Sequence, residues 1–269
     1  MSILQSIILG VVQGLTEFLP ISSTGHLILA RSFFNIENTN ALAFDAILHL
    51  ATATAVIVYF RKDLWILSQA MLRKLSRLPV NGRDEVLVYA LMAGTVPAVI
   101  LGLTLENLMG SVFRSPLLVA GVLLLGSVLF MYAEWAYVHQ PRKPVMTVKK
   151  GLKIGFFQSL ALIPGMSRSG ASICGGMLLG FTRSEAARFS FLLAIPVILG
   201  AGAKKMLELM GSGIPIDWFT VGTGAAASFV TGIVAIHFML SFVKNHTLWP
   251  FIWYRIILAV FVIYIFISG

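Results

Sequence analysis

Two polar segments interrupt an otherwise apolar chain, and they repeat one pattern. Residues 20–26 read Pro-Ile-Ser-Ser-Thr-Gly-His, and residues 164–170 read Pro-Gly-Met-Ser-Arg-Ser-Gly. A constant shift of 145 residues superposes identical residues in the two halves: Gly10 on Gly155, Gln13 on Gln158, Leu15 on Leu160, Ser22 on Ser167, Gly25 on Gly170, and Phe44 on Phe189. We interpret the chain as an internal duplication whose two polar segments correspond.

The composition indicates whether lipid or water surrounds this protein. Hydrophobic residues make up 58% of the sequence and charged residues only 12%, far below the share in soluble domains. This composition predicts an integral membrane protein. The net charge of +9 does not indicate a nucleic acid partner, because the basic residues lie in short stretches between apolar runs, as orientation signals do. No Lys or Arg precedes the first apolar run, so we expect that helix to be retained rather than cleaved as a signal peptide.

Apolar runs of two lengths predict the fold. Two pairs of half-length runs, 3–19 with 24–34 and 152–163 with 171–181, are separated by Pro and a Ser/Gly-rich turn. Such turns occur at membrane depth only where protein or water covers them, so each pair predicts a re-entrant helical hairpin. Six further runs are long enough to cross a bilayer, which takes roughly 20 apolar residues: 42–60, 86–105, 116–138, 186–203, 218–243 and 249–267.

Each half then contains one hairpin and three spans. An odd number of crossings inverts the second half in the membrane, so the two hairpin tips are expected to meet near the midplane. The predicted fold is an all-α integral membrane protein, with six transmembrane helices and two re-entrant helical hairpins in an inverted-topology repeat. It forms a single membrane domain over 1–269, with repeat one at about 1–138 and repeat two at about 150–269.

The distribution of Lys and Arg predicts the orientation. These residues are densest in the connections 61–83 and 142–150, which should therefore be cytoplasmic. Both termini should lie outside, and the first hairpin should enter from the external face. Cys174 is the only cysteine, so no intrachain disulfide can form.

The residues at the two breaks predict an anion site. Gln13 and Glu17 are four apart and share one helix face, and Ser22, Ser23 and Thr24 stand where they can cap the next half-helix. His26 lies one turn beyond Ser23, the spacing that can activate a hydroxyl nucleophile. The second break repeats the pattern and adds a guanidinium, so two helix N-termini and one Arg should converge on a phosphate. The second-break residues are Ser167, Arg168, Ser169 and Gly170, and Gly25 is the counterpart of Gly170 in the first.

Each residue also has a structural interpretation. Glu17 and Arg168 could simply neutralise each other, and His26 alone is more typical of helix packing, but their coincidence at both breaks favours function. For the remaining polar residues within spans we favour lining or packing roles: His49, Glu134, His237 and Arg255. The aromatic residues Trp249, Trp253 and Tyr254 are typical of an interfacial belt.

The segments 13–26 and 164–170 resemble the two signature motifs of bacterial undecaprenyl-diphosphate phosphatases of the bacitracin-resistance type. The similarity includes the hairpin positions and the closing segment Tyr254-Arg255. The similarity spans nearly the whole chain. It implies hydrolysis of undecaprenyl diphosphate to undecaprenyl phosphate and inorganic phosphate, which recycles the carrier lipid of cell-wall synthesis. It also implies a divalent cation, Mg²⁺ or Ca²⁺, and a location in the bacterial inner membrane. With the orientation predicted from Lys and Arg, the site faces the periplasmic side. Many family members have Glu where this chain has Gln13, so the metal would have one negative ligand fewer.

The resemblance suggests catalytic and binding roles for the residues at the two breaks. Ser23 would attack phosphorus with His26 as general base, or His26 would orient water; Arg168 and the half-helix amides would stabilise the phosphoryl charge. Glu17, with help from Gln13, would bind the metal. The substrate-binding set is Ser22, Thr24, Gly25, Ser167, Ser169 and Gly170.

Two other classes of protein share these features. Inverted repeats are typical of transporters, so a flippase for the lipid phosphate is one alternative. The type-2 phosphatidic acid phosphatases are another, but Cys174 occupies the position where their distal His is expected. The expected partners are undecaprenyl diphosphate and membrane lipid, and the sequence leaves a homodimer open.

Overall fold

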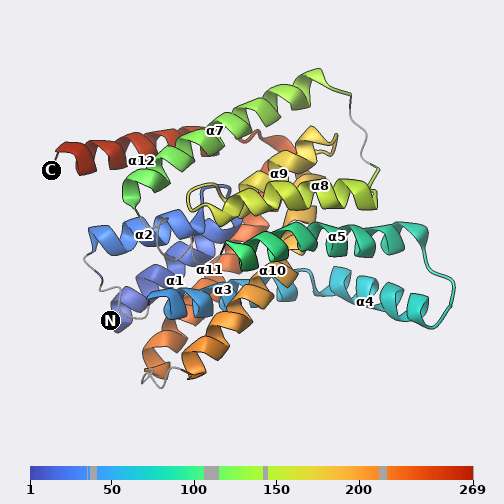
Figure 1. Ribbon diagram of the computed structural model, residues 1–269, viewed down its shortest axis with the longest axis horizontal. Coiled ribbons are helices and arrows are strands. Elements are labelled where there is room, and N and C mark those ends of the chain that lie inside the picture. The colour runs from blue at the N-terminus through green and yellow to red at the C-terminus, as the bar shows by residue number, and fades with distance from the viewer. Residues whose placement is uncertain (35, 37–40, 106–114, 142–144, 212–216, 269) are drawn as a thin grey trace.

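The computed structural model describes residues 1–34, 36, 41–105, 115–141, 145–211 and 217–268, and this part of the chain is helical without a strand (Figure 1). The side chains of 41–43 and 268 are outside the description. The predicted all-α class is therefore confirmed. The helices are α1 (Ile3–Phe18), α2 (Ser23–Phe33), α3 (Ala41–Tyr59), α4 (Arg61–Leu75), α5 (Gly82–Thr104), α7 (Pro116–His139), α8 (Val148–Ser159), the 3₁₀ turn η1 (Leu160–Leu162), α9 (Arg168–Leu178), α10 (Arg183–Gly211), α11 (Trp218–Asn245) and α12 (Trp249–Ser268).

Five of the described helices are long and apolar enough to cross a membrane: α5, α7, α10, α11 and α12. They coincide with the predicted spans 86–105, 116–138, 186–203, 218–243 and 249–267. The remaining predicted span, 42–60, is α3, which continues into α4 through a bend of 79°. If this bent pair counts as one span, the number rises to six. The chain is a multi-pass membrane protein.

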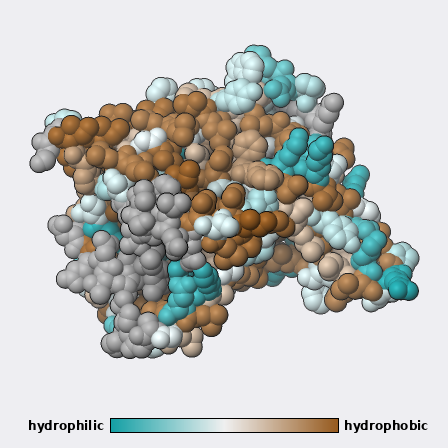
Figure 2. Space-filling model, viewed as in Figure 1, coloured by the Kyte–Doolittle hydropathy of each residue, from teal (hydrophilic) through white to brown (hydrophobic). Residues whose placement is uncertain are grey.

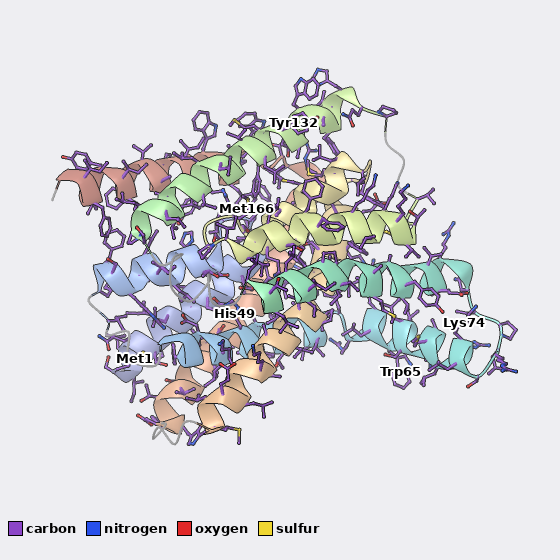
Figure 3. All side chains as sticks on the ribbon, in the orientation of Figure 1. Met1, His49, Trp65, Lys74, Tyr132 and Met166 are labelled. Carbon is purple, nitrogen blue, oxygen red and sulfur yellow. The ribbon has the colours of Figure 1, made fainter. Side chains whose placement is uncertain are left out.

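The basic connection after α3 is itself a helix, which the sequence analysis did not predict. Asp63 lies in the first turn of α4, and Arg73 and Lys74 lie in its last turn, so the charges complement the helix dipole. Lys74 Nζ lies 2.6 Å from Glu85 Oε1 of α5. Figures 1 and 3 show α4 and α5 side by side, with Lys74 at their shared tip. The charged residues of 61–75 interrupt its apolar pattern, so the segment is typical of a loop as well as of a helix.

Two helical hairpins occupy the middle of the molecule. Helices α1 and α2 form the first hairpin, and α8, η1 and α9 form the second. The hairpins run in from opposite ends of the molecule and their breaks meet at its centre (Figure 1). This meeting was expected from the duplication. Their re-entry into a bilayer, like the inverted topology, stays a prediction, since both depend on where the bilayer lies.

Glycine pairs bring each hairpin into backbone contact with a span. A Cβ on Gly10 of α1 would lie 2.2 Å from the carbonyl oxygen of Gly224 in α11, and one on Gly155 of α8 would lie 2.1 Å from that of Gly94 in α5. Gly14 and Gly151 repeat these approaches one turn away, so both helices carry the small-xxx-small spacing that lets membrane helices pack closely. The duplicated glycines Gly10 and Gly155 therefore do the same job in each half.

The outer surface is apolar where lipid would contact it. Large hydrophobic side chains such as Trp253, Ile257 and Phe261 of α12 are exposed. Figure 2 shows a continuous hydrophobic area over α7 and α12, and hydrophilic residues at the tip of α4 and α5. An exposed apolar surface of this extent is typical of a protein embedded in lipid.

Candidate active site at the meeting of two helix breaks

The two breaks share an unusual backbone conformation. Ser22 precedes α2 with φ of 76°, and Ser167 precedes α9 with φ of 73°. A positive φ is uncommon for a residue with a Cβ, and it occurs at corresponding positions of the duplication. Each serine Oγ accepts a hydrogen bond from the third residue of its helix: Gly25 N at 3.3 Å and Gly170 N at 3.2 Å. Ser22, one of three residues expected to cap α2, is thus the N-cap, and the strained caps aim both helix N-termini at the centre.

Hydrogen bonds join one break directly to the other. The backbone N–H of Gly165 donates to Ser22 Oγ at 3.1 Å, and Ser169 Oγ donates to the carbonyl of Leu19 at 3.1 Å. Residues about 145 positions apart in the chain therefore form one structural unit. Neither half could build this site alone.

Arg255 of α12 holds the two breaks from a fully buried position. Its Nη1 donates to the carbonyl oxygens of Pro20 and Met166, at 3.4 and 3.2 Å, and its Nη2 donates to that of Gly165 at 3.1 Å. The guanidinium also lies over the ring of Phe130, with 4.7 Å between Cζ and the centroid. The packing role favoured for Arg255 from the sequence fits these contacts, because its acceptors are neutral oxygens of the fold.

Glu17 is at the centre of the candidate site and is buried. Its Oε1 accepts from Arg168 Nη2 at 2.8 Å, so the carboxylate of one hairpin pairs with the guanidinium of the other. Its Oε2 accepts from Ser23 Oγ at 2.6 Å and from Gln13 Nε2 at 2.8 Å. Three of the residues named from the sequence, Arg168, Ser23 and Gln13, therefore meet on the Glu17 carboxylate.

Several hydrogen-bond donors at this point are unused. Arg168 Nη1 is buried and has no partner among the described residues. The first-turn amides of Ser23, Thr24, Arg168 and Ser169 also have no acceptor in the described part of the chain. Unpaired buried donors are costly, and helix N-termini attract anions. Two helix ends and half of a guanidinium are thus available to an anion such as phosphate.

His26 is held by partners other than Ser23. Because a carbonyl oxygen can only accept, His26 Nδ1–H donates to the carbonyl of Ser22 at 2.7 Å, and Nε2 then accepts from the hydroxyl of Tyr254 at 2.7 Å. The two rings stack with centroids 5.6 Å apart. Ser23 Oγ instead donates to Glu17, so the structure does not join Ser23 to the base that the sequence suggested. The sequence favours an interfacial belt for Tyr254, and no local signal links it to a residue 228 positions away.

His49 of α3 also reaches the carboxylate. Its Nδ1 lies 3.3 Å from Glu17 Oε2 and 2.9 Å from Gln13 Nε2. Lining or packing is the role that the sequence favours for His49, and the residue does line the site, near the middle of the bundle in Figure 3. A histidine on an apolar span was the signal available in the sequence.

The remaining predicted binding residues differ in their placement. Thr24 is exposed, whereas Ser167 and Ser169 are buried with 3.2 Å between their hydroxyl oxygens. Gly25 and Gly170 are buried by packing: a Cβ on Gly170 would lie 2.0 Å from a phenylalanine ring carbon. These two glycines shape the breaks and donate to the caps.

Two polar groups lie apart from this centre. Glu134 of α7 pairs with Arg183 of α10 and accepts from Leu248 N at 2.7 Å. His237 of α11 lies 3.2 Å from the hydroxyl of Tyr59. Both fit the structural roles favoured for them.

The donor set offers a limited place for a cation. Among the described residues, no three side chains from His, Cys, Asp and Glu come together. However, Gln13 Oε1 is buried without a partner beside the Glu17 carboxylate. An unused acceptor next to a carboxylate fits a divalent cation that takes its other ligands from phosphate and water.

Comparisons with known proteins agree over nearly the full length. A family model described as bacitracin resistance protein BacA matches residues 6–261. An undecaprenyl-diphosphatase of Marinobacter nauticus is 40% identical, over 96% of this chain and 97% of its own. One of Rubrobacter xylanophilus is 41% identical, over 97% of both chains, and one of Myxococcus xanthus is 39% identical, over 100% of this chain and 91% of its own.

Proposed function

The chain belongs to the bacitracin resistance protein BacA family, and we propose that the paired helix breaks are the site at which it hydrolyses a lipid diphosphate. The protein is an undecaprenyl-diphosphatase, which converts undecaprenyl diphosphate and water into undecaprenyl phosphate and inorganic phosphate. Its relatives bear the name of a hydrolase, so the flippase alternative is not favoured.

One observation carries the proposal for the site. Arg168, the first residue of α9, uses one terminal nitrogen to pair with Glu17, while the other is buried and has no partner among the described residues. A terminal phosphate placed there would accept from Arg168 Nη1 and from the first-turn amides of α2 and α9. Phosphoryl transfer depends mostly on positioning and on such preorganised donors.

Ser23 is the proposed nucleophile. Its hydroxyl already donates to Glu17 Oε2 at 2.6 Å, so Glu17 would receive the proton as Ser23 Oγ bonds to the terminal phosphorus. The bond from that phosphorus to the bridging oxygen breaks, and undecaprenyl phosphate departs. Water then cleaves the phosphoserine, releases inorganic phosphate and restores the hydroxyl. Direct attack by water held between Glu17 and Ser23 is the alternative route.

His26 and Tyr254 would act on the leaving group, undecaprenyl phosphate. Their hydrogen bond of 2.7 Å keeps a hydroxyl proton and an imidazole one turn from Ser23. The predicted role of His26 as base for Ser23 stays a prediction, and the contacts described above support Glu17 for that step instead. The isoprenoid tail would leave between spans into the bilayer, for which the exposed apolar helices are suited.

The cation implied by the family would be held by Glu17 Oε2 and the amide oxygen of Gln13. When bound, Mg²⁺ or Ca²⁺ would neutralise diphosphate charge and orient the terminal phosphate. Chelation is expected to abolish hydrolysis, because Gln13 adds no negative charge to compensate for its loss.

Release of inorganic phosphate from undecaprenyl diphosphate by the purified protein in detergent tests the proposed site. We expect the wild type to be active and Ser23→Ala to have a much lower turnover, with little change in KM. Wild-type turnover in Ser23→Ala would exclude the covalent route, and wild-type turnover in Arg168→Gln would exclude the site.

The side of the membrane is proposed from charge. The basic stretches 61–83 and 142–150 support a cytoplasmic location for those segments of a bacterial inner-membrane protein, with the site open to the periplasm. Positions 111 and 142 lie outside the described residues. In a Cys174→Ser background, Ser111→Cys should react with an impermeant thiol reagent on intact cells, and Arg142→Cys should not. The reverse pattern would move the site to the cytoplasmic face. The homodimer stays a prediction.

A further inference from the structure

We propose that His49 completes the cation site with Glu17 and Gln13, and that the site therefore binds a first-row divalent ion such as Mn²⁺ more tightly than Ca²⁺. The inference rests on the proposed function, since it concerns the same carboxylate. It assigns a third protein ligand on a helix, α3, that belongs to neither hairpin.

Three side-chain atoms, from Gln13, Glu17 and His49, have a spacing that suits ligands of one metal ion. Gln13 Nε2 lies 2.8 Å from Glu17 Oε2 and 2.9 Å from His49 Nδ1, and His49 Nδ1 lies 3.3 Å from Glu17 Oε2. In an octahedral complex with bonds of about 2.1 Å, neighbouring ligand atoms stand about 3.0 Å apart. The three atoms therefore have the spacing of one face of a coordination octahedron.

The amide of Gln13 can present oxygen to that face. Nitrogen and oxygen of a Gln side chain exchange places by a half-turn of the amide, and their assignment follows the hydrogen bonds of the moment. As oriented here, Nε2 contacts Glu17 and His49, and Oε1 is buried without a partner. A bound cation would favour the flipped amide of Gln13. Its bond to Oε1 would replace the two contacts that Nε2 makes with Glu17 and His49.

The charge of the site favours a different ion from that expected of a carboxylate cage. Glu17 Oε1 is engaged by Arg168, so a cation would share Oε2 with the hydrogen bond from Ser23 Oγ, and the other two ligands are neutral. Mg²⁺ and Ca²⁺ are held chiefly by charged oxygens, whereas an imidazole nitrogen adds affinity for first-row ions. Phosphate oxygens and water would complete the coordination on the opposite face.

Packing keeps His49 in register with α1. Ser228 Oγ of α11 donates to the carbonyl of Leu48 at 3.1 Å, and the side chain of Leu50 fills the space above Gly202 of α10. Thr52 Oγ donates to the carbonyl of His49 itself at 2.7 Å. A ligand on a helix fixed on both sides can be preorganised for a metal.

Mn²⁺ is the probe for the test. Titration of detergent-purified wild-type protein, followed by the electron paramagnetic resonance signal of free Mn²⁺, gives the affinity without turnover. Electron spin echo modulation from ¹⁴N then reports whether an imidazole is bound to the ion. We expect ¹⁴N modulation in the wild type, an affinity at least tenfold higher for Mn²⁺ than for Ca²⁺ in competition, and loss of the modulation in His49→Gln with at least tenfold weaker Mn²⁺ binding.

Matched variants separate ligation from folding. His237→Gln removes an imidazole that contacts Tyr59 and should alter neither affinity nor modulation. Gln13→Glu should strengthen Ca²⁺ binding more than Mn²⁺ binding, because it adds a charged oxygen. Bound Mn²⁺ without ¹⁴N modulation in the wild type, absence of Mn²⁺ binding, or unaltered affinity in His49→Gln would each overturn the inference. Those results leave the hydrolase intact if phosphate is still released, whereas a wild type inactive with every cation refutes the proposed function.

Discussion

Replacement of Arg168 by Lys separates catalysis from charge neutralisation. In the structure Nη2 pairs with Glu17 at 2.8 Å, while the buried Nη1 is left for the substrate. Lys has a single nitrogen on its side chain, so it can keep the ion pair or contact the phosphate, and the fork that does both is lost.

The expected magnitude follows from that geometry. If the Lys ammonium stays on Glu17, no charge is left uncompensated and stability should barely change, whereas breaking a buried pair costs about 3–5 kcal/mol. The phosphoryl group loses one preorganised donor, which costs about 2.7–4 kcal/mol in the transition state. Turnover should therefore fall by about 100- to 1000-fold.

The assay is phosphate release from undecaprenyl diphosphate at saturating substrate, together with thermal unfolding of the same samples in detergent. Arg183→Lys is the matched control, because Arg183 donates through two nitrogens to Glu134 away from the breaks. It should lower the unfolding temperature but retain turnover. Turnover of Arg168→Lys within threefold of wild type would refute the reasoning and leave the helix N-termini as the principal phosphate ligands.

Further outcomes are expected at the breaks. Ser23→Ala should lower kcat at least 100-fold with little change in KM, measured by phosphate release. Tyr254→Phe removes the hydroxyl bound to His26 and should lower kcat more modestly, by about the tenfold that one hydrogen bond of about 1.4 kcal/mol provides. Gly170→Ala should destabilise the fold by about 1–3 kcal/mol through overpacking, and thermal unfolding should show no such loss for Gly121→Ala, whose added methyl meets open space.

Local patterns were enough to predict both breaks and the helices other than α4. The runs 3–19 and 24–34 became α1 and α2 because Pro20 and the capping Ser22 mark a helix end and start that any packing must respect. The duplication then indicated that the second break would be built alike, and the paired φ values of Ser22 and Ser167 agree. Bringing the breaks together required only that two equivalent polar turns avoid lipid.

Contacts between distant helices could not be predicted from local sequence patterns. His49 and Tyr254 come to the site from α3 and α12, and which face of an apolar helix turns inward is decided by packing against neighbours. A helix that is apolar on all sides has no periodicity to reveal that face. The same limit applies to Ser23, whose spacing to His26 suggested a pair while Glu17, across the break, takes its hydrogen bond.

The position of Arg255 limits how the molecule can move. Its guanidinium donates to carbonyl oxygens on both sides of the central seam, those of Pro20 in one hairpin and of Gly165 and Met166 in the other. Rocking of one half against the other, as alternating access requires, would pull these acceptors apart and strand a cation in the protein interior. Arg255 therefore holds the two hairpins together at the place where a carrier would have to open. We therefore expect substrate to come and go by lateral diffusion while the two breaks stay together, and any conformational change to involve side chains and the outer ends of the helices.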